Sequence, residues 1–144
     1  MYSLLIAGAV VFLDQATKYL VRISIRAGEA VSLLPWLELV NVRNQGAAFG
    51  IFSGLGNGFF ISISIAAIIF MVWVVATGKD DYRIFALLAG GAGGNLIDRI
   101  ALGHVVDFID IGAGRYHWPA FNVADSALSL GMILMAVNIL RSRP

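Results

Sequence analysis

Two aspartates are the residues of this sequence best placed to do chemistry. Asp107 lies just past one apolar segment, and Asp125 lies at the start of the next. A carboxylate at membrane depth is energetically costly, so such a residue is a functional candidate by default. Two carboxylates that converge can share one proton, and such a pair is the acid–base unit that aspartic proteases use to activate a water molecule.

The composition indicates the class of protein that must position these acids. The chain has 144 residues, of which 59% are hydrophobic and 13% charged, and its mean hydropathy is +0.84. These values predict an integral membrane protein with a single domain over residues 1–144. The net charge of +1 argues against a nucleic-acid partner. The sequence has no cysteine, which excludes disulfides, thiol nucleophiles and thiolate metal sites.

Four apolar segments predict transmembrane helices near residues 3–22, 57–76, 83–102 and 121–140. Each is close to the roughly 20 residues that a helix needs to cross the hydrocarbon. We interpret the first as a retained helix and not as a signal peptide, because it lacks a basic start and continues through Asp14 and Lys18. The predicted fold class is an all-α membrane protein with a small β element in extracytoplasmic segments near 23–56 and 103–120.

The order of the helices brings most of the unusual polar residues to one membrane face. With four spans, the end of the first helix, the start of the second, the end of the third and the start of the fourth share a side. That side carries Asp14, Lys18, Asn44, Asn95, Asp98, Arg99, Asp107, Asn122 and Asp125. Such a concentration predicts a functional site and is not expected of a passive anchor.

Basic residues give the orientation. Lys79, Arg83, Arg141 and Arg143 crowd into the short segments of the opposite side, whereas the basic residues of the site side are spread over longer segments. By the positive-inside rule, the density of basic residues places the opposite side in the cytoplasm, although their total number on each side does not. The site is therefore expected near the extracytoplasmic face.

The two connections on the site side differ in character. Residues 31–43 are rich in β-branched residues and partly alternate, which predicts short strands, with Pro35 at an edge or turn and Trp36 at headgroup depth. Residues 103–120 contain Gly112, Gly114 and Pro119, and we expect a loop there. We also expect residues 28–49 to act as a mobile lid that admits substrate and then excludes water.

Three polar or glycine-rich motifs allow both a structural and a functional interpretation. Asp14 and Lys18, at i and i+4, either fix the first helix to its neighbours or contact substrate. Asn44 and Gly46 either form a simple turn before the second helix or belong to the site. In the third helix, the G-x-x-x-G pair of Gly90 and Gly94 predicts close helix packing, and the glycine-rich run raises the chance of a kink.

Two polar clusters follow along the chain. Asn95, Asp98 and Arg99 share one helical face, where the arginine could clamp a carboxylate or the cluster could hold a substrate backbone. Asn122, Asp125, Ser126 and Ser129 form a polar stripe on the fourth helix. Asp125 could also be a simple N-terminal helix charge, but Asp107 can reach the same face.

Other catalytic chemistries find little support in the sequence. His104 and His117 are the only histidines, and neither belongs to a zinc-binding H-E-x-x-H or H-x-x-E-H motif. There is no G-x-S-x-G motif, and Ser126 has no histidine or lysine base placed beside it. We expect no cofactor.

Five sequence blocks together resemble bacterial lipoprotein signal peptidase, also called signal peptidase II. They are Asp14-Gln15-x-Thr17-Lys18, Asn44-x-Gly46-Ala47-Ala48-Phe49, Gly94-Asn95-Leu96-Ile97-Asp98-Arg99, Val105-Val106-Asp107-Phe108 and Phe121-Asn122-x-Ala124-Asp125-Ser126. The blocks occur in the family's order from the first helix to the last. The sequence departs from the family pattern at Gly93, where leucine is commoner, and in its short termini.

The resemblance implies a four-helix aspartic protease of the bacterial inner membrane. Such an enzyme removes signal peptides from prolipoproteins just before the diacylglyceryl-modified cysteine. Asp107 and Asp125 match the catalytic pair. The matching site-shaping positions are Asp14, Lys18, Asn44, Gly46, Asn95, Asp98, Arg99, Asn122 and Ala124. The expected partners are the prolipoprotein substrate and membrane lipids, and we expect a monomer.

Two other classes of membrane protein fit the sequence less well. A small transporter or proton-conducting subunit should place its acids along a path through both leaflets. Here the acids gather at one face, and the second helix offers only Ser62 and Ser64 between Phe59 and Val75. A scaffold protein held together by its G-x-x-x-G motif leaves the two aspartates unexplained.

Overall fold

The computed structural model describes residues 2–46, 53–78 and 81–141. Its long helices are α1 (Tyr2–Ser24), α2 (Gly56–Thr77), α3 (Tyr82–Leu102) and α4 (Val123–Arg141), and a short 3-10 helix η2 (Ser53–Leu55) precedes α2. All four long helices have the length and apolar composition needed to cross a membrane. The four predicted helices are confirmed, with ends that differ from the predicted ones by no more than two residues.

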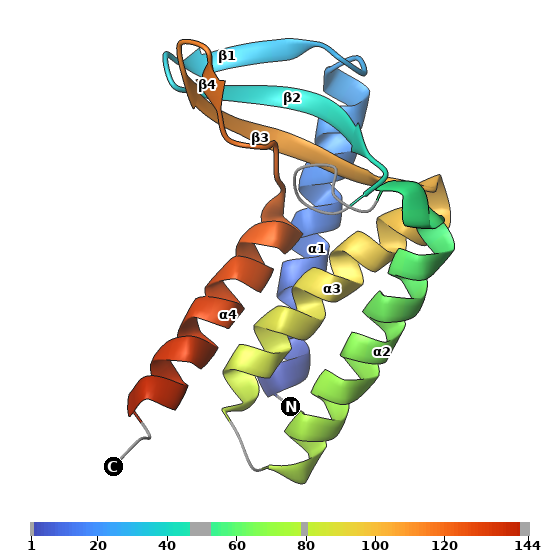
Figure 1. Cartoon of the computed structure of the whole chain (residues 1–144), viewed down its shortest axis with the longest axis vertical. Coiled ribbons are helices and arrows are strands. Elements are labelled where there is room, and N and C mark those ends of the chain that lie inside the picture. Colours follow the sequence, from blue (N-terminus) through green and yellow to red (C-terminus); the bar gives the residue numbers. More distant parts are fainter. Residues whose placement is uncertain (1, 47–52, 79–80, 142–144) are drawn as a thin grey trace.

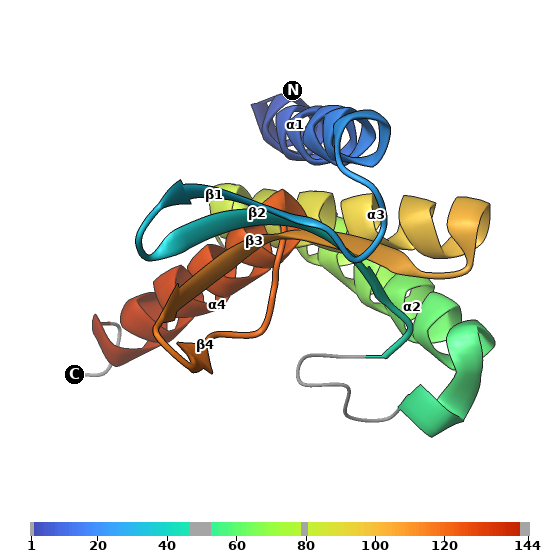
Figure 2. The same ribbon diagram turned by 90° about the horizontal axis from the view of Figure 1, so that it is seen from above.

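Helix α3 lies at the centre of the bundle and packs against α1, α2 and α4 (Figures 1 and 2). Its glycines allow this close approach. A Cβ added at Gly90 would come within 2.9 Å of the Ala7 carbonyl oxygen of α1, and one at Gly91 within 2.6 Å of the Ala124 carbonyl oxygen of α4. The predicted packing role of the glycine motif is confirmed, and α3 continues through the motif as an unbroken α-helix.

Four antiparallel strands form a small sheet in the order β1-β2-β3-β4. They are β1 (Ala30–Leu34), β2 (Leu37–Asn44), β3 (Val105–Ala113) and β4 (Tyr116–His117). The predicted strands between residues 31 and 43 are confirmed as β1 and β2, with Pro35 and the exposed Trp36 in the turn between them.

The expectation of a loop over residues 103–120 is wrong, because β3 and β4 occupy much of this segment. The glycines and Pro119 that suggested a loop lie at the end of β3 or beyond it. The first part of β3, from Val105 to Ile111, is rich in the β-branched residues that strands favour. Strand β3 pairs with β2 over most of that length.

The chain returns from β4 to β3 before it enters α4. Phe121 forms an isolated bridge with Ile109, in which the backbone N–H groups of Phe108 and Ile109 donate to the Phe121 carbonyl at 3.0 and 2.8 Å. The Phe121 N–H donates back to the Ile109 carbonyl at 3.0 Å. The first turn of α4 is therefore held against the middle of β3.

The sheet covers one end of the helices, and the start of α1 and the end of α4 lie towards the other (Figure 1). A buried apolar cluster of Val21, Ile25 and Phe108 joins the end of α1 to β3, and Leu39, Ile109 and Val123 pack around it. This cluster therefore joins α1, the sheet and the start of α4. These elements also carry polar residues of the site described next.

Candidate active site

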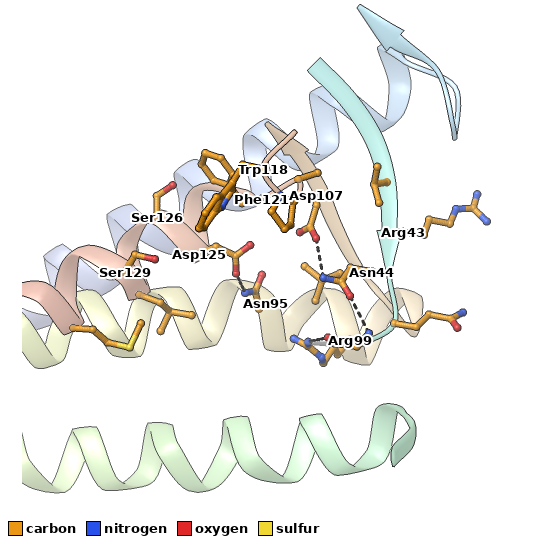
Figure 3. Close-up of a pocket in the computed structure, with 18 residues that line it drawn as sticks. Arg43, Asn44, Asn95, Arg99, Asp107, Trp118, Phe121, Asp125, Ser126 and Ser129 are labelled. Carbon is orange, nitrogen blue, oxygen red and sulfur yellow. Dashed lines mark hydrogen bonds between the residues drawn. The ribbon is translucent and has the colours of Figure 1, made fainter. Parts of the chain in front are cut away.

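Asp107 of β3 and Asp125 of α4 line the same cavity, which has a volume of about 830 Å³ (Figure 3). Asp107 is only 2% exposed, and Asp125 is half-buried. The rest of the wall comes from β2 and the residues after it, α3, the segment after β4, and α4. Among the lining residues are Asn44, Gly46, Asn95, Arg99, Trp118, Phe121, Ser126, Leu128, Ser129 and Met132.

Asn122 contacts both acids. Its side-chain Nδ2 donates to Asp107 Oδ1 at 2.7 Å, and its backbone N–H donates to Asp125 Oδ2 at 3.3 Å. The Asp125 N–H donates in turn to Asn122 Oδ1 at 2.8 Å, so the two residues form a reciprocal cap at the start of α4. Asn122 therefore precedes the helix and is not part of the predicted stripe, whereas Asp125, Ser126 and Ser129 lie on the helix and line the same cavity.

A further asparagine holds each acid on its other side. Asn44 Nδ2 donates to Asp107 Oδ2 at 2.9 Å, and Asn95 Nδ2 donates to Asp125 Oδ1 at 2.8 Å. The Oδ1 of Asn44 accepts the Gly46 N–H at 2.9 Å, which fixes the orientation of that amide. Both oxygens of each carboxylate are thus hydrogen-bonded, and the acids are held in place without a salt bridge to either of them among the described residues.

Burial and charge raise the pKa of Asp107 to about 6. Burial is the larger cause, and the negative charge of Asp125 adds to it, while the amides of Asn44 and Asn122 act in the opposite direction. A carboxyl group with a pKa near neutrality can both hold and release a proton at the working pH, as a general acid–base group must.

An ion-pair cluster lies behind the cavity wall, between α1 and α3. Lys18 Nζ is 2.7 Å from Asp14 Oδ2 and 3.1 Å from Asp98 Oδ2, and it donates to Asn95 Oδ1 at 3.0 Å. All three charged side chains are at most 3% exposed. This arrangement supports the structural interpretation of the Asp14–Lys18 pair, since the lysine neither reaches the cavity nor extends towards the surface.

The same cluster connects to β3 and α4 through backbone amides. Asp14 Oδ1 accepts the N–H of the fully buried Ala124 at 2.9 Å, and Asp98 Oδ2 accepts the Val106 N–H, also at 2.9 Å. Gln15 Nε2 donates to Asp98 Oδ1 and to the Gly94 carbonyl, both at 3.0 Å. Sequence reasoning passed over Gln15 as a site-shaping residue, although an amide beside Asp14 in an apolar helix was a usable signal.

Arg99 lies on a different side of α3 from Asp98. Its Nη2 donates to the Gly46 carbonyl at 3.0 Å, and its guanidinium lies 5.0 Å from the centre of the Phe60 ring. Within the described ranges Arg99 forms no salt bridge with a carboxylate. Its contact with Gly46 instead fixes the chain after β2. Asn57 Nδ2 of α2 also donates to the Arg99 backbone carbonyl at 2.8 Å, and nothing in the sequence marked Asn57 or Phe60. Ala47, Ala48 and Phe49 of the same sequence block lie outside the described residues.

The two histidines lie away from the acids. His104 Nδ1 contacts the Leu102 carbonyl at 2.9 Å, and His117 Nδ1 lies 2.7 Å from Asp110 Oδ1 on the sheet. The Asp110 carboxylate raises the pKa of His117. Neither histidine lines the cavity that contains Asp107 and Asp125.

The four helices are long and apolar enough to cross a membrane, and the cavity at one end of them contains two carboxylates. These features define the class as an integral membrane protein with a two-carboxylate site. The family described as Signal peptidase (SPase) II matches residues 6–141 of the chain. The chain belongs to this family of peptidases, and the resemblance drawn from its motifs is confirmed.

Relatives and solved structures agree with this assignment. A lipoprotein signal peptidase from Thermodesulfovibrio yellowstonii is 45% identical over 132 residues, which cover 92% of this chain and 90% of the relative. A lipoprotein signal peptidase from Staphylococcus aureus is 43% identical over an alignment of 146 residues, which covers 96% of this chain and 88% of the relative. A bacterial membrane enzyme solved by the in meso method at 2.3 Å resolution superposes with a TM-score of 0.87 at 39% identity, covering 97% of this chain and 88% of the other. The chain is a multi-pass membrane protein.

Proposed function

We propose that this chain is an aspartic endopeptidase that removes signal peptides from prolipoproteins, on the N-terminal side of the diacylglyceryl-modified cysteine. Asp107 and Asp125 are its catalytic pair. The named activity of the relatives supports the substrate class, since they match nearly the whole chain. The observation that carries the aspartic mechanism is the placement of both carboxylates in one cavity, with Asn122 hydrogen-bonded to each.

The pair works with one proton between its two members. The ionised aspartate takes a proton from a water molecule while the protonated aspartate donates its own to the scissile carbonyl oxygen. The water oxygen attacks the carbonyl carbon, and a tetrahedral intermediate forms. Collapse of the intermediate breaks the C–N bond as a proton passes to the leaving nitrogen. The products are a carboxyl group and an amine, and the pair again holds one proton.

The surrounding residues position the reacting groups. The amides of Asn44, Asn95 and Asn122 fix the carboxylates in advance, so little reorganisation is needed during the reaction. Leu128 and Met132 extend the cavity wall along α4, beyond Asp125. An apolar wall beside a polar site suits a substrate that joins a peptide to acyl chains, and those chains can remain in the bilayer while the peptide enters.

The cavity lies at the sheet end of the helices, which we place at the extracytoplasmic face of the bacterial inner membrane. The density of basic residues near the opposite end supports this orientation. We propose that the enzyme acts as a monomer, because all the groups assigned to the reaction come from a single chain.

Amide substitutions at the two acids test the mechanism. Asp107→Asn and Asp125→Asn should each lower cleavage of a lipidated prolipoprotein by at least about 10⁴-fold, since an amide cannot cycle a proton. The assay follows the shift of the product band with purified enzyme. Asp110→Asn is the matched control, because Asp110 lies on the same strand but contacts His117 and is not part of the cavity wall.

The outcomes separate the mechanism from the substrate class. Turnover near the wild-type rate in either catalytic variant would remove that residue from the reaction. Cleavage of the unlipidated precursor at the same rate as the lipidated one would instead contradict the proposed substrate. Thermal unfolding of each variant in detergent shows whether a loss of activity has its origin in the chemistry or in the fold.

A further inference from the structure

A second pocket, of about 310 Å³, lies at the end of the helices opposite the sheet. It is formed where the start of α3 meets the last turns of α4, near the C-terminal end of the chain in Figure 1. Its walls include Arg83 and Ile84 from α3 and Leu134, Val137, Asn138 and Arg141 from α4. None of these residues takes part in the site proposed above.

The polar part of this pocket can receive an anion. Arg83 and Arg141 line it, and within residues 2–46, 53–78 and 81–141 neither guanidinium lies within 4.0 Å of a carboxylate. Arg83 Nε donates to the neighbouring Tyr82 hydroxyl at 3.4 Å, and its guanidinium lies 5.6 Å from the centre of that ring. Asp81 also lines the pocket, but its Oδ1 accepts the Arg83 backbone N–H at 2.9 Å and caps α3. Arginine pairs bind phosphate oxygens well, because each planar guanidinium offers two parallel N–H donors.

The remaining part of the pocket is apolar. Ile84, Leu134 and Val137 supply this wall, and both α4 residues are more than a third exposed. A free phosphate ion would gain nothing from these side chains. A molecule with an anionic head and an apolar tail would use both parts, and basic pockets between helix ends are a known mode of lipid headgroup recognition.

We propose that this pocket binds an anionic phospholipid of the adjacent leaflet. Arg83 and Arg141 hold the phosphate, Asn138 adds an amide donor, and the first part of an acyl chain lies along Ile84, Leu134 and Val137. Because the two arginines come from different helices, the bound lipid joins the start of α3 to the end of α4. Occupancy should therefore stabilise the pairing of these helices, and α4 carries Asp125 at its other end.

Lipid binding to the purified protein tests this site. The protein in neutral detergent is titrated with dioleoyl phosphatidylglycerol, dioleoyl phosphatidylcholine or inorganic phosphate, and bound lipid and Tm are measured by native mass spectrometry and tryptophan fluorescence. We expect saturable binding and a higher Tm with phosphatidylglycerol alone. Arg83→Gln and Arg141→Gln should each weaken that binding about tenfold, whereas Arg115→Gln, an exposed arginine on the sheet side, should not.

Each result supports or overturns the proposal. Equal binding of phosphatidylcholine would show that the arginines do not select the headgroup. The full Tm increase with inorganic phosphate alone would show an anion site without a lipid. Wild-type affinity in both arginine variants would show that the lipid binds elsewhere. If one variant fails to fold, the other still decides the question, because the two arginines lie on separate helices.

Discussion

At the scale of single residues, Asn122 performs two separable tasks. Its Oδ1 caps α4 through the Asp125 N–H, and its Nδ2 donates to Asp107. A polar N-cap contributes about 1 kcal/mol to the stability of a helix. A preorganised donor at a reacting group contributes to rate instead. One residue therefore connects the fold of α4 to the chemistry of the pair.

Serine at position 122 should separate these tasks. Asn122→Ser keeps a good capping oxygen but loses the amide N–H, so we expect a Tm above that of Asn122→Ala and a kcat about 100-fold below wild type. Asn122→Ala should lose turnover to a similar extent and unfold at the lowest temperature of the three. Normal turnover in Asn122→Ser would show that the side-chain donor has no part in catalysis.

The raised pKa of Asp107 makes the stability of the protein depend on pH. The pKa rises from 3.8 to about 6 on folding, so the folded state disfavours the ionised carboxylate. The stability that this carboxyl group contributes is therefore fully present below pH 3.8, the ordinary pKa, and is lost as the pH rises towards 6. Above that pH the loss is constant.

A comparison with Asp107→Asn isolates this effect. The wild type should lose about 2–3 kcal/mol of unfolding free energy relative to the variant between pH 4 and pH 7. Comparing the two proteins at both pH values cancels the cost of placing an amide against Asn44 and Asn122, because that cost does not change with pH. Chemical denaturation in detergent measures the difference, and a constant difference across this range would contradict the assigned pKa.

At the scale of elements, the glycines of α3 set the distance between that helix and α4. A Cβ at Gly91 would lie 2.6 Å from the Ala124 carbonyl oxygen, a backbone atom that cannot move without shifting the start of α4. Gly91→Ala should therefore destabilise the protein by about 1–3 kcal/mol and lower kcat, because Asp125 moves with that helix.

Gly93→Ala is the matched control for this substitution. Its Cβ would meet only Val11 Cγ2, at 3.4 Å, which is an ordinary packing distance. Alanine is also the better helix former, so the variant should be as stable as the wild type or slightly more so. Thermal unfolding and the cleavage assay compare the two variants. Similar losses in both would show that glycine matters here for some reason other than helix contact.

The sequence predicted the helices better than the strands, for a physical reason. About 20 apolar residues have few alternatives to a membrane span, so the bounds of α1 to α4 could be read closely. Strand β3 was missed because the glycines at its end outweighed the β-branched residues at its start. Helical spacing placed Asp98 and Arg99 on one face, but adjacent residues point about 100° apart, and the two contact different neighbours.

At the scale of the whole molecule, the cavity lies at the sheet end of the helices, and the start of α1 and the end of α4 lie at the other (Figure 1). The order of four spans was enough to predict this separation from the sequence. The lid expected over residues 28–49 stays a prediction. Strand β2 lies within that range and is hydrogen-bonded to β3, from Leu37 opposite Ile111 to Asn44 opposite Val105, so a motion of the whole segment must break that pairing.

Labelling of single cysteines tests the orientation of the molecule. The sequence has no cysteine of its own, and Ser32 of β1 and Thr77 of α2 are both exposed. With the sheet outside the cytoplasm, Ser32→Cys should react with an impermeant thiol reagent in intact cells and Thr77→Cys should react only after lysis. The reverse pattern would place the cavity in the cytoplasm.

The bridge between Ile109 and Phe121 consists of backbone hydrogen bonds, so it does not depend on the side chains at those two positions. The separation of the acids is consequently independent of how much chain connects them. Extra residues inserted after Gly114, in the exposed turn between β3 and β4, would lengthen the connection without moving either carboxylate. Evolution or a protein engineer can therefore add an epitope or a recognition loop there while the catalytic spacing is inherited unchanged.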